Sequence, residues 1–448
     1  MAQDEYQATG KELIYVDVVE DSDGHITDGE FNYCRLEDGS VCVYVRNLKS
    51  TGGRIPDSVN LNDVFYDVSS ISVDGFSRSK LKSIILPETL EVISNYAFEC
   101  CANLTSIVVP EGVRYIGQGA FNQCHGLTSI ILPPTLIEIG PSAFAKCSSL
   151  TSIIVPEGVE VIEDYAFEGC DNLVSIHLPQ TLKKLGAFAF SQCHNLASII
   201  IPESVEWFGH YAFAECHNLT SVTLPKTLSE IPAFSFLNCR KLESIELPDS
   251  LETIHTGAFS GCASLVSIFL PQSVTSIDGH VFNNCGNLSY ISVDKRNSIF
   301  DSRNDSNAII MTSSNVLIYG ANRTIIPDSV VEIGLDAFFG RTFESVIIPK
   351  NVQSIENGAF YGCERLHAVY ISEGVVHIKP EAFGECGLLT DVTNLNSEPQ
   401  IIEQDTFSTY GTLHVWPGCK EAFKKADFWK EFTIVEDGGE WSYAAVSR

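Results

Sequence analysis

The chain has 448 residues and a formal net charge of −29, with 57 aspartates and glutamates against 28 lysines and arginines. Nucleic acids and anionic membrane surfaces both attract basic proteins, so this balance argues against either as a partner. No apolar run in the sequence approaches the roughly 20 residues that a membrane-spanning helix needs. The acidic excess is expected to keep a long apolar chain soluble and monomeric.

The first residues, Met1 to Glu5, are polar and acidic, so they do not form a signal peptide. Two readings follow: the protein is cytosolic, or the sequence begins after a signal that has been removed. Residues 1–53 carry no repeat and are expected to form an N-terminal β-hairpin cap. The stretch 31–45 has Asp38-Gly39 as its turn, and a three-residue loop there would place Cys34 opposite Cys42. The sequence leaves open whether these two cysteines are bonded.

From Leu81 to Asn287 the chain repeats one pattern of 23 residues nine times. Self-similarity at a short fixed period indicates a solenoid, in which each repeat buries its apolar face against its neighbours. The recurring prolines are Pro87, Pro110, Pro133, Pro156, Pro179, Pro202, Pro225, Pro248 and Pro271. The recurring phenylalanines are Phe98, Phe121, Phe144, Phe167, Phe190, Phe213, Phe236, Phe259 and Phe282.

One repeat, residues 104–126, shows how the pattern works. Its opening, L-x-x-I-x-V, is typical of a leucine-rich repeat strand: Ile107 and Val109 alternate with Val108, so one side is buried. Pro110 ends the strand because it has no N–H to donate. After Pro110 the chain turns back, and Val113 and Ile116 point inward on this returning segment. Ala120-Phe121 and Cys124 then fill the side of the core that lies opposite the first strand. The expected fold is a right-handed leucine-rich repeat solenoid of about 13 turns, capped at both ends.

The motifs Leu-Thr-Ser-Ile-x-(Leu/Val)-Pro and Ala-Phe-x-x-Cys resemble the BspA-like leucine-rich repeat family over about residues 54–410. This resemblance implies a scaffold found mostly in surface and secreted proteins of anaerobic bacteria and in some protists. It also implies adhesion to host or bacterial proteins, and it favours the reading in which a signal has been removed. It implies no enzymatic activity, because the family is defined by its scaffold.

Eleven of the 15 cysteines lie on the repeat ladder: Cys101, Cys124, Cys147, Cys170, Cys193, Cys216, Cys239, Cys262, Cys285, Cys363 and Cys386. A small apolar side chain at the same place in every turn indicates packing, so these are predicted to be buried free thiols. Parallel Cβ vectors on stacked turns give poor disulfide geometry. A zinc stack is a weaker alternative still, because the sequence has no compact Cys/His quartet at metal spacing. Cys193→Ser is expected to destabilise because its hydroxyl would lack a partner. Free thiols suit a reducing or oxygen-free setting.

After Val293 the phase of the repeat breaks. Pro327 follows Pro271 by 56 residues, so 33 residues are inserted, at about residues 294–326. Residues 308–312 and 316–319 around Ser313 to Asn315 predict a second hairpin, expected to project from the stack and to be dispensable. Four oxygen-bearing side chains there suggest either calcium or a polar turn, and the spacing favours the turn: Asp301, Asn304, Asp305 and Asn307.

The repeats resume at Pro327 and Pro349, with Arg341 in place of the ladder cysteine. They fade through Phe407. Residues 411–448 are expected to form a C-terminal helical cap and tail, because residues 418–430 place Ala422, Phe423, Ala426 and Trp429 on one helical face.

Motifs of catalysis are scarce: the sequence has no phosphate-binding glycine loop, G-x-S-x-G or H-E-x-x-H. The serines at the third strand position recur in every repeat and are interpreted as a hydroxyl ladder. His194 and His217 lie one repeat apart and would stack, as a two-histidine metal site or, better, as a solvated turn position. No cofactor and no metal are expected.

The fifth strand position is expected to point outward on the concave face. Along the stack it reads Ile85, Val108, Ile131, Ile154, His177, Ile200, Thr223, Glu246 and Phe269. These residues either reflect the preference of strands for β-branched side chains or mark a binding surface. We take Ile85, Val108, Ile131, Ile154, His177, Ile200 and Phe269 as the candidate partner-binding residues. A second, aromatic stripe is Tyr165, Phe188, Tyr211 and Phe234, for which a turn packed on itself is the alternative.

The sequence thus predicts a non-enzymatic protein-binding or adhesion protein, secreted or at the bacterial surface, with a protein ligand and weak self-association as a possibility. The alternative is a structural or intracellular scaffold, with a cytoplasmic location. An enzyme ranks third.

Overall fold

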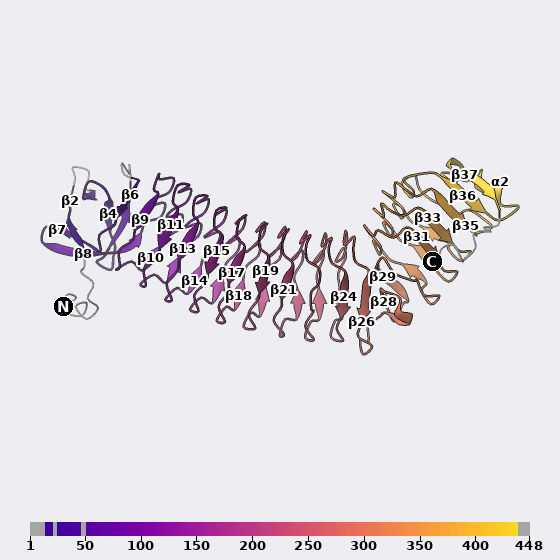
Figure 1. Ribbon diagram of the computed structural model, residues 1–448, viewed down its shortest axis with the longest axis horizontal. Coiled ribbons are helices and arrows are strands. Elements are labelled where there is room, and N and C mark those ends of the chain that lie inside the picture. Colours follow the sequence, from indigo (N-terminus) through magenta and orange to yellow (C-terminus); the bar gives the residue numbers. More distant parts are fainter. Residues whose placement is uncertain (1–13, 21–24, 46–50, 438–448) are drawn as a thin grey trace. The chain divides into compact units, whose positions relative to one another are not determined.

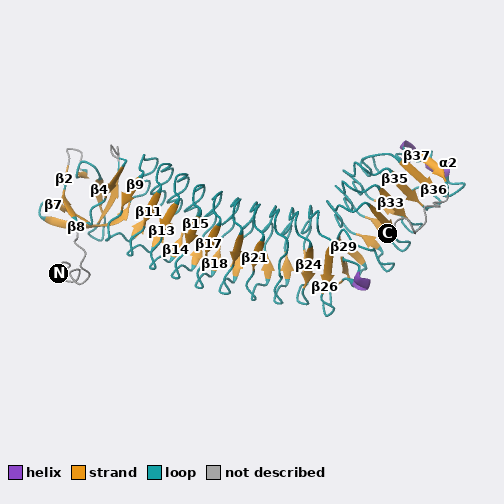
Figure 2. Ribbon diagram, viewed as in Figure 1, coloured by secondary structure: helices purple, strands orange, loops and turns teal. Residues whose placement is uncertain are grey.

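The computed structural model describes residues 14–20, 25–45 and 51–437. The chain winds into a β-solenoid of about 17 stacked turns with almost no helix (Figure 1, Figure 2). The leucine-rich repeat solenoid is therefore confirmed, with more turns than the 13 expected, because segments outside the regular motif also form turns. Two compact units, Met1–Pro225 and Lys226–Arg448, make up the chain and are described separately.

The turns of the first unit contribute two short strands each, one on either side of the proline turn. The first strands are β6 (Gly52–Arg54), β9 (Ser83–Ile85), β11 (Ser106–Val108), β13 (Ser129–Ile131), β15 (Ser152–Ile154), β17 (Ser175–His177), β19 (Ser198–Ile200) and β21 (Ser221–Thr223). The second strands are β8 (Val64–Ile71), β10 (Val92–Ile93), β12 (Tyr115–Ile116), β14 (Glu138–Ile139), β16 (Val161–Ile162), β18 (Lys184–Leu185) and β20 (Trp207–Phe208). The second strands pair in parallel from β8 to β20 in one sheet, whereas the first strands pair in parallel two by two. Each pairing is at a step of one repeat, as between Ile107 and Ile130.

The core between the two strand ladders is a stack of phenylalanines. The rings of Phe98, Phe121 and Phe144 lie with centroids 5.2 and 5.3 Å apart and planes within 7° of parallel, and all three are fully buried. Such stacking adds to the burial of about 150–250 Å² per aromatic side chain. A repeat alone has no neighbouring ring, so the core exists only in the stack.

Behind each phenylalanine the backbone follows a tight path with left-handed residues. Tyr165 has φ 60° and Lys146, two residues after Phe144, has φ 58°. This path aims backbone N–H groups along the solenoid axis, so Tyr165 and Phe167 donate to the carbonyls of Ala187 and Ala189, each at 2.8 Å. The turn is therefore bonded to the next turn as well as within itself, where the N–H of Glu168 donates to the carbonyl of Tyr165 at 3.0 Å.

The ladder cysteines are free and buried, as predicted. These thiols donate to phenylalanine carbonyls of the preceding turn: Cys193 Sγ lies 3.2 Å from the carbonyl oxygen of Phe167, and Cys216 Sγ lies 3.2 Å from that of Phe190. The expectation that a serine hydroxyl here would lack a partner is wrong, because that carbonyl is present. The S–H group thus satisfies a buried acceptor as well as filling space.

The N-terminal segment forms β1 (Tyr15–Asp17), β2 (Val19–Glu20), β3 (Ile26–Thr27), β4 (Asn32–Arg35), β5 (Val41–Tyr44) and β7 (Ser58–Leu61). The β4–β5 hairpin is confirmed, with Cys34 in register with Cys42, both as free thiols. β5 pairs with β8 and so extends the second-strand ladder. Asp57 ties this cap to the first repeat, because its carboxylate accepts from the N–H groups of Ile14 and Glu88 at 2.8 and 2.7 Å.

The second unit continues the same two-strand plan. Its first strands are β24 (Ser267–Leu270), β26 (Tyr290–Val293), β31 (Ser345–Ile348), β33 (Ala368–Ile371), β35 (Asp391–Asn394), β36 (Thr412–Val415) and β37 (Thr433–Glu436). Its second strands are β22 (Glu230–Ile231), β23 (Thr253–Ile254), β25 (Ser276–Ile277), β30 (Glu332–Ile333), β32 (Ser354–Ile355) and β34 (His377–Ile378).

The inserted hairpin is part of the stack, so the expectation that it projects is wrong. It forms β27 (Phe300–Asp301), β28 (Ala308–Met311) and β29 (Val316–Gly320), and β29 pairs in parallel with β30. Ala308, Ile309, Ile310 and Leu317 are fully buried, and Tyr319 points inward, donating its hydroxyl to the carbonyl of Asp278 at 2.5 Å. The sequence pattern did not show this because strand alternation alone does not say what covers a hairpin.

Beside the insert, Arg341 stands at the position of a ladder cysteine and makes the hydrogen bond to a phenylalanine carbonyl that the thiol makes elsewhere. It is 1% exposed, and its guanidinium donates to the carbonyls of Gly320 and Phe282 at 2.8 and 2.9 Å. In a regular turn a thiol would reach the phenylalanine carbonyl, as Cys363 Sγ reaches that of Phe338 at 3.2 Å. A longer side chain is needed here because the insert separates the two turns.

The C-terminal cap contains less helix than expected. α2 (Lys420–Phe423) is a single turn, η2 (Trp429–Glu431) is a short 3-10 helix, and β37 extends the ladder beyond β36. Phe428 has φ 64°, which ends any continuous helix. Phe423 and Trp429 are buried, and Trp429 Nε1 donates to the carbonyl of Gln400 at 2.8 Å. The inward face was predicted correctly, although the helix that would carry it was not.

Candidate protein-binding surface

The strands β9, β11, β13, β15 and β19 place one aliphatic side chain each on the outer surface of the first unit. The exposed fractions are 56% for Ile85, 59% for Val108, 62% for Ile131, 71% for Ile154 and 67% for Ile200. The expected outward orientation is confirmed: in each strand the middle residue is buried and its two neighbours are exposed. We call these five residues, together with His177, the apolar strip.

Pairing of the strands brings the members of the apolar strip together. Val108 is in register with Ile131, and Ile154 is in register with His177. Paired strands lie about 4.8 Å apart, so the side chains within each pair are direct neighbours. The pairs β11-β13 and β15-β17 are separate two-stranded sheets on successive turns, so the strip consists of adjacent pairs. His177 is exposed and interrupts the aliphatic character between Ile154 and Ile200. Phe269, which is 50% exposed on β24, belongs to the second unit and is considered apart from the row.

A column of exposed serines runs beside the apolar strip. The serines that begin the strands are Ser83, Ser106, Ser129, Ser152, Ser175, Ser198 and Ser221, and all are exposed. Next to them, the hydroxyl of Thr128 donates to the carbonyl of Thr105 at 2.9 Å. The surface therefore combines an aliphatic row with hydroxyl groups available for hydrogen bonds.

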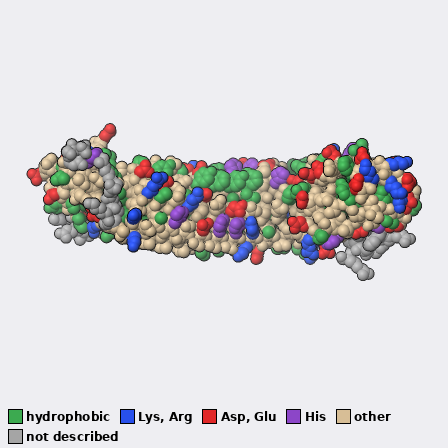
Figure 3. Space-filling model, turned by 90° about the horizontal axis from the view of Figure 1, so that it is seen from above, with side chains coloured by type: hydrophobic (Ala, Val, Ile, Leu, Met, Phe, Trp, Pro, Cys, Tyr) green, Lys and Arg blue, Asp and Glu red, His purple; other side chains and the backbone are tan. Residues whose placement is uncertain are grey.

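Acidic residues follow the proline turns at the end of the strands. Glu111 and Glu157 are exposed, whereas Glu88 is half-buried. The carboxylate of Glu157 accepts from the N–H of Gln180 at 2.9 Å, so it also supports the next turn. On the face seen in Figure 3, charged side chains of both signs lie among uncharged ones, and no basic band runs along the described residues.

The aromatic stripe stacks on itself. The ring of Phe188 lies 4.8 Å from that of Tyr165 and 4.6 Å from that of Tyr211, with planes within 6° of parallel. His194 and His217 likewise stack, with ring centroids 4.7 Å apart, as predicted. His217 Nε2 is 2.8 Å from a carboxylate oxygen of Glu215, and His194 Nδ1 is 3.0 Å from the carbonyl of that residue. These contacts are those of packed turns.

The groups with shifted pKa values are structural. Burial raises the pKa of Cys147 and of Cys216 to about 12, and it raises the pKa of Tyr33 well above its ordinary value. In the insert, Asp301 pairs with Arg303 at 2.6 Å, and Asn304 lies in a 3-10 turn with φ 57°. The polar-turn interpretation of this segment is thus confirmed.

Within the described residues, no three His, Cys, Asp or Glu side chains cluster as a metal site would require. Nor does any described helix combine the length and the apolar character needed to cross a bilayer.

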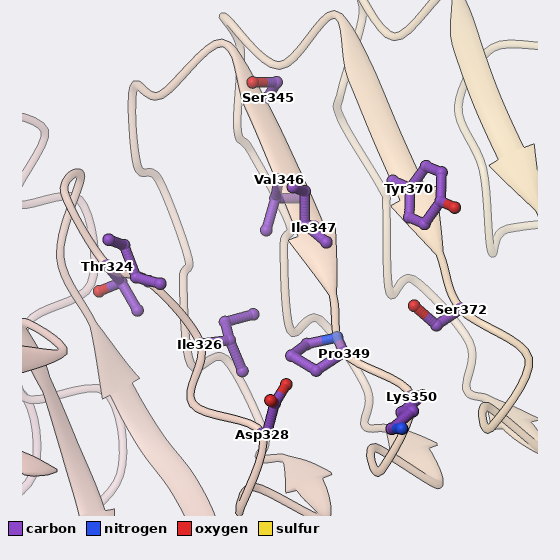
Figure 4. A pocket seen from close by; sticks show the side chains of 11 residues that line it. Thr324, Ile326, Asp328, Ser345, Val346, Ile347, Pro349, Lys350, Tyr370 and Ser372 are labelled. Atoms are coloured by element: carbon purple, nitrogen blue, oxygen red, sulfur yellow. The ribbon is translucent and has the colours of Figure 1, made fainter. Parts of the chain in front are cut away.

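Sequence reasoning missed a pocket of about 420 Å³ in the second unit (Figure 4). It lies between the chain at Thr324, Ile325 and Ile326 and the strands β31 and β33. Asp328 and Lys350 line its lower end in Figure 4. The sequence signal for this pocket was the interruption of the repeat between Pro271 and Pro327. That interruption indicates that neighbouring turns differ, but it does not indicate that a gap opens between them.

Comparison with known proteins agrees with this architecture. The model of the BspA type leucine rich repeat region matches residues 69–197, 138–247, 183–308 and 320–415. A leucine-rich repeat protein from Bacteroides ovatus is 29% identical, with 87% of this chain and 98% of that chain covered and a TM-score of 0.66. A leucine rich cell surface protein from Faecalibacterium prausnitzii is 21% identical, with 93% and 96% covered and a TM-score of 0.37. The pneumococcal vaccine antigen PcpA is 15% identical, with 94% and 98% covered and a TM-score of 0.35.

None of the curated protein sequences matches the chain. The family model nevertheless covers well over half of it, across both units. The chain belongs to the BspA-type leucine-rich repeat family.

Proposed function

We propose that this protein is a non-enzymatic adhesion protein, secreted or held at the bacterial surface, that binds a host or bacterial protein through the apolar strip. The observation that carries the proposal is a set of five aliphatic side chains, each more than half exposed. Four of them, Ile85 to Ile154, lie on four successive first strands, and Ile200 follows beyond His177. Strand propensity explains why such residues occur in strands, but it does not require that the same exposed position be aliphatic in the four successive repeats from Ile85 to Ile154.

Physical chemistry favours a protein as the occupant. Burying apolar surface stabilises a complex by about 25 cal/mol per Å², and stable interfaces have a desolvated apolar centre within a polar rim. The aliphatic row supplies the centre and the serine column supplies rim hydroxyls. The net charge of −29 favours a partner with a basic surface, because complementary charge speeds association and excludes acidic competitors. Phe269 is proposed as a further contact on the second unit.

Family membership supports the extracellular location, since the family resemblance implies surface and secreted proteins. One observation favours the alternative, an intracellular scaffold: the protein has many free, buried thiols, and free thiols persist best in a reducing compartment. An oxygen-free environment outside the cell would satisfy the same observation. Fractionation of the native cells into cytosol, envelope and medium decides between the two locations.

The binding proposal is tested with the double variant Ile131→Asp and Ile154→Asp. Both side chains are exposed, so we expect the melting temperature to change little. Capture of partners from host extracellular matrix and from neighbouring bacteria should be lost, and the Kd of a purified partner should rise at least tenfold. A matched control is Val376→Asp with Leu388→Asp, which are 59% and 49% exposed in the second unit. A double variant that folds and binds normally would show that the strip is not the docking surface.

A further inference from the structure

The first-strand ladder of the second unit is open at β31. In its five-stranded sheet the strand order is β31-β33-β35-β36-β37, so β31 is the terminal strand. The chain that precedes it along the stack is bonded elsewhere: the N–H of Asn322 donates to the carbonyl of Leu288 at 2.7 Å, and the N–H of Ile325 donates to that of Ser306 at 3.2 Å. Asn322 still contacts the segment before β31, because its side-chain carbonyl accepts from the N–H of Thr342 at 2.8 Å. Beyond it, residues 324–326 are separated from β31 by the pocket.

The hydrogen bonds of β31 show which of its backbone groups face the opening. The carbonyls of Glu344 and Ile348 accept from the N–H groups of Ala368 and Ser372, each at 3.3 Å. In a parallel ladder, alternate residues bond to opposite sides. Ser345 and Ile347 consequently direct their N–H and carbonyl groups away from β33, toward the pocket.

The pocket is shaped for a single extended chain. Its volume of about 420 Å³ falls within the range of ligand sites, and it is walled by β31 on one side and by residues 324–326 on the other (Figure 4). Ile325, 77% exposed, offers apolar surface beside Ile347. The walls combine unpaired strand edge with apolar side chains, which is the combination that strand addition uses.

We propose that this open edge is a second binding site, which takes an extended peptide segment of a partner protein as an added strand beside β31. The segment bonds to the N–H and carbonyl groups of Ser345 and Ile347 and places an apolar side chain against Ile325 and Ile347. The net charge of −29 selects a segment with basic residues around this core. The site is separate from the apolar strip and does not depend on it.

A folded second copy of this chain fits the site less well than a peptide. The edge of β31 faces residues 324–326 across the pocket, so the incoming strand has to be covered on both sides. A single segment enters such a gap, whereas a strand that is already part of another sheet brings its neighbours with it. In folded proteins an exposed strand edge is normally covered so that it does not pair with other folded molecules. Here residues 324–326, which face β31 across the pocket, provide that cover.

The test uses random dodecapeptides displayed on phage and selected on the full-length protein. Enriched peptides are synthesised, and their Kd is measured by fluorescence anisotropy. Ile347→Pro removes the one N–H of that residue, which the ladder to β33 does not use, so the fold should persist. We expect at least a tenfold weaker peptide affinity for Ile347→Pro and an unchanged affinity for Ile347→Val. Peptides N-methylated at alternate residues should also lose binding, because methylation blocks main-chain pairing.

Hydrogen exchange supplies a readout that needs no variant. In the free protein the amide proton of Ile347 should exchange quickly and that of Ile348 slowly, and the peptide should slow exchange at Ile347 at least tenfold. Slow exchange at Ile347 without peptide would show that the edge is already paired and would overturn the proposal. The proposal also fails if no peptide is enriched, or if Ile347→Pro and N-methylated peptides bind normally. Peptide binding should survive Ile131→Asp with Ile154→Asp, which separates this site from the apolar strip.

Discussion

The regular repeats of the first unit and the insert of the second unit pack by different means. In the regular part a residue meets its own equivalent one repeat away, as Phe121 meets Phe144. Around the insert, partners are unlike and far apart in sequence: Arg341 bonds to Phe282, and Tyr319 bonds to Asp278. Periodic packing therefore tolerates the gain or loss of a whole period, whereas the insert is held by contacts that no other turn can supply.

Deleting residues 296–322 behind a short linker should have the largest effect. The deletion removes five fully buried apolar residues, Ala308, Ile309, Ile310, Leu317 and Ala321. It also removes Gly320, which accepts from Arg341, and β29, which pairs with β30. Truncating a buried Leu or Ile costs about 2–5 kcal/mol, and a whole domain is stable by about 5–15 kcal/mol. We expect the second unit to lose cooperative unfolding, measured by urea titration with circular dichroism.

The matched control removes one whole repeat, residues 150–172, from the first unit. That deletion keeps the phase of every remaining contact, so cooperative unfolding should persist. Equal midpoints for the wild type and the 296–322 deletion would contradict the role that we assign to the insert.

Arg341→Ala should destabilise the second unit by about 2–4 kcal/mol, because it leaves buried carbonyls without a donor. Burial lowers the pKa of this guanidinium. Arg341→Lys keeps the charge, but its ammonium group cannot reach Gly320 and Phe282 in the same geometry. The stability of this variant should therefore lie between that of the wild type and that of Arg341→Ala. Urea midpoints measure the series, and an alanine variant as stable as the wild type would rule out this bridging role.

Cys193→Ser should have the smallest effect, about 1 kcal/mol, since the hydroxyl keeps the carbonyl of Phe167 as an acceptor at a less favourable distance. Burial raises the pKa of the Cys193 thiol well above its ordinary value. The native protein should therefore leave Cys193 unmodified by iodoacetamide at neutral pH while the exposed Cys34 reacts. Mass spectrometry reads both sites, and disulfides between neighbouring ladder cysteines would contradict the free-thiol assignment.

The period alone was enough to predict the solenoid, the burial of Phe121 and Cys193, and the exposure of Ile131. It works because each position meets the same environment in every repeat. It failed where that environment changes. The path of residues 322–326, and so the open edge of β31, depends on bonds to Leu288 and Ser306 that no pattern records. The C-terminal helix was overestimated because its apolar spacing also suits the packed turn that Phe428 creates.

The left-handed residues behind each phenylalanine bear on how the chain folds. Two such positions recur in each repeat, and side chains occupy most of them, as Tyr165, Phe188 and Gln192 do. A left-handed conformation costs about 1–2 kcal/mol for each residue other than glycine. A lone turn bears this cost without the bonds to its neighbours that offset it. We therefore expect folding to begin only when several adjacent turns form together, and to spread from that nucleus turn by turn, with a kinetic pause wherever the period is interrupted.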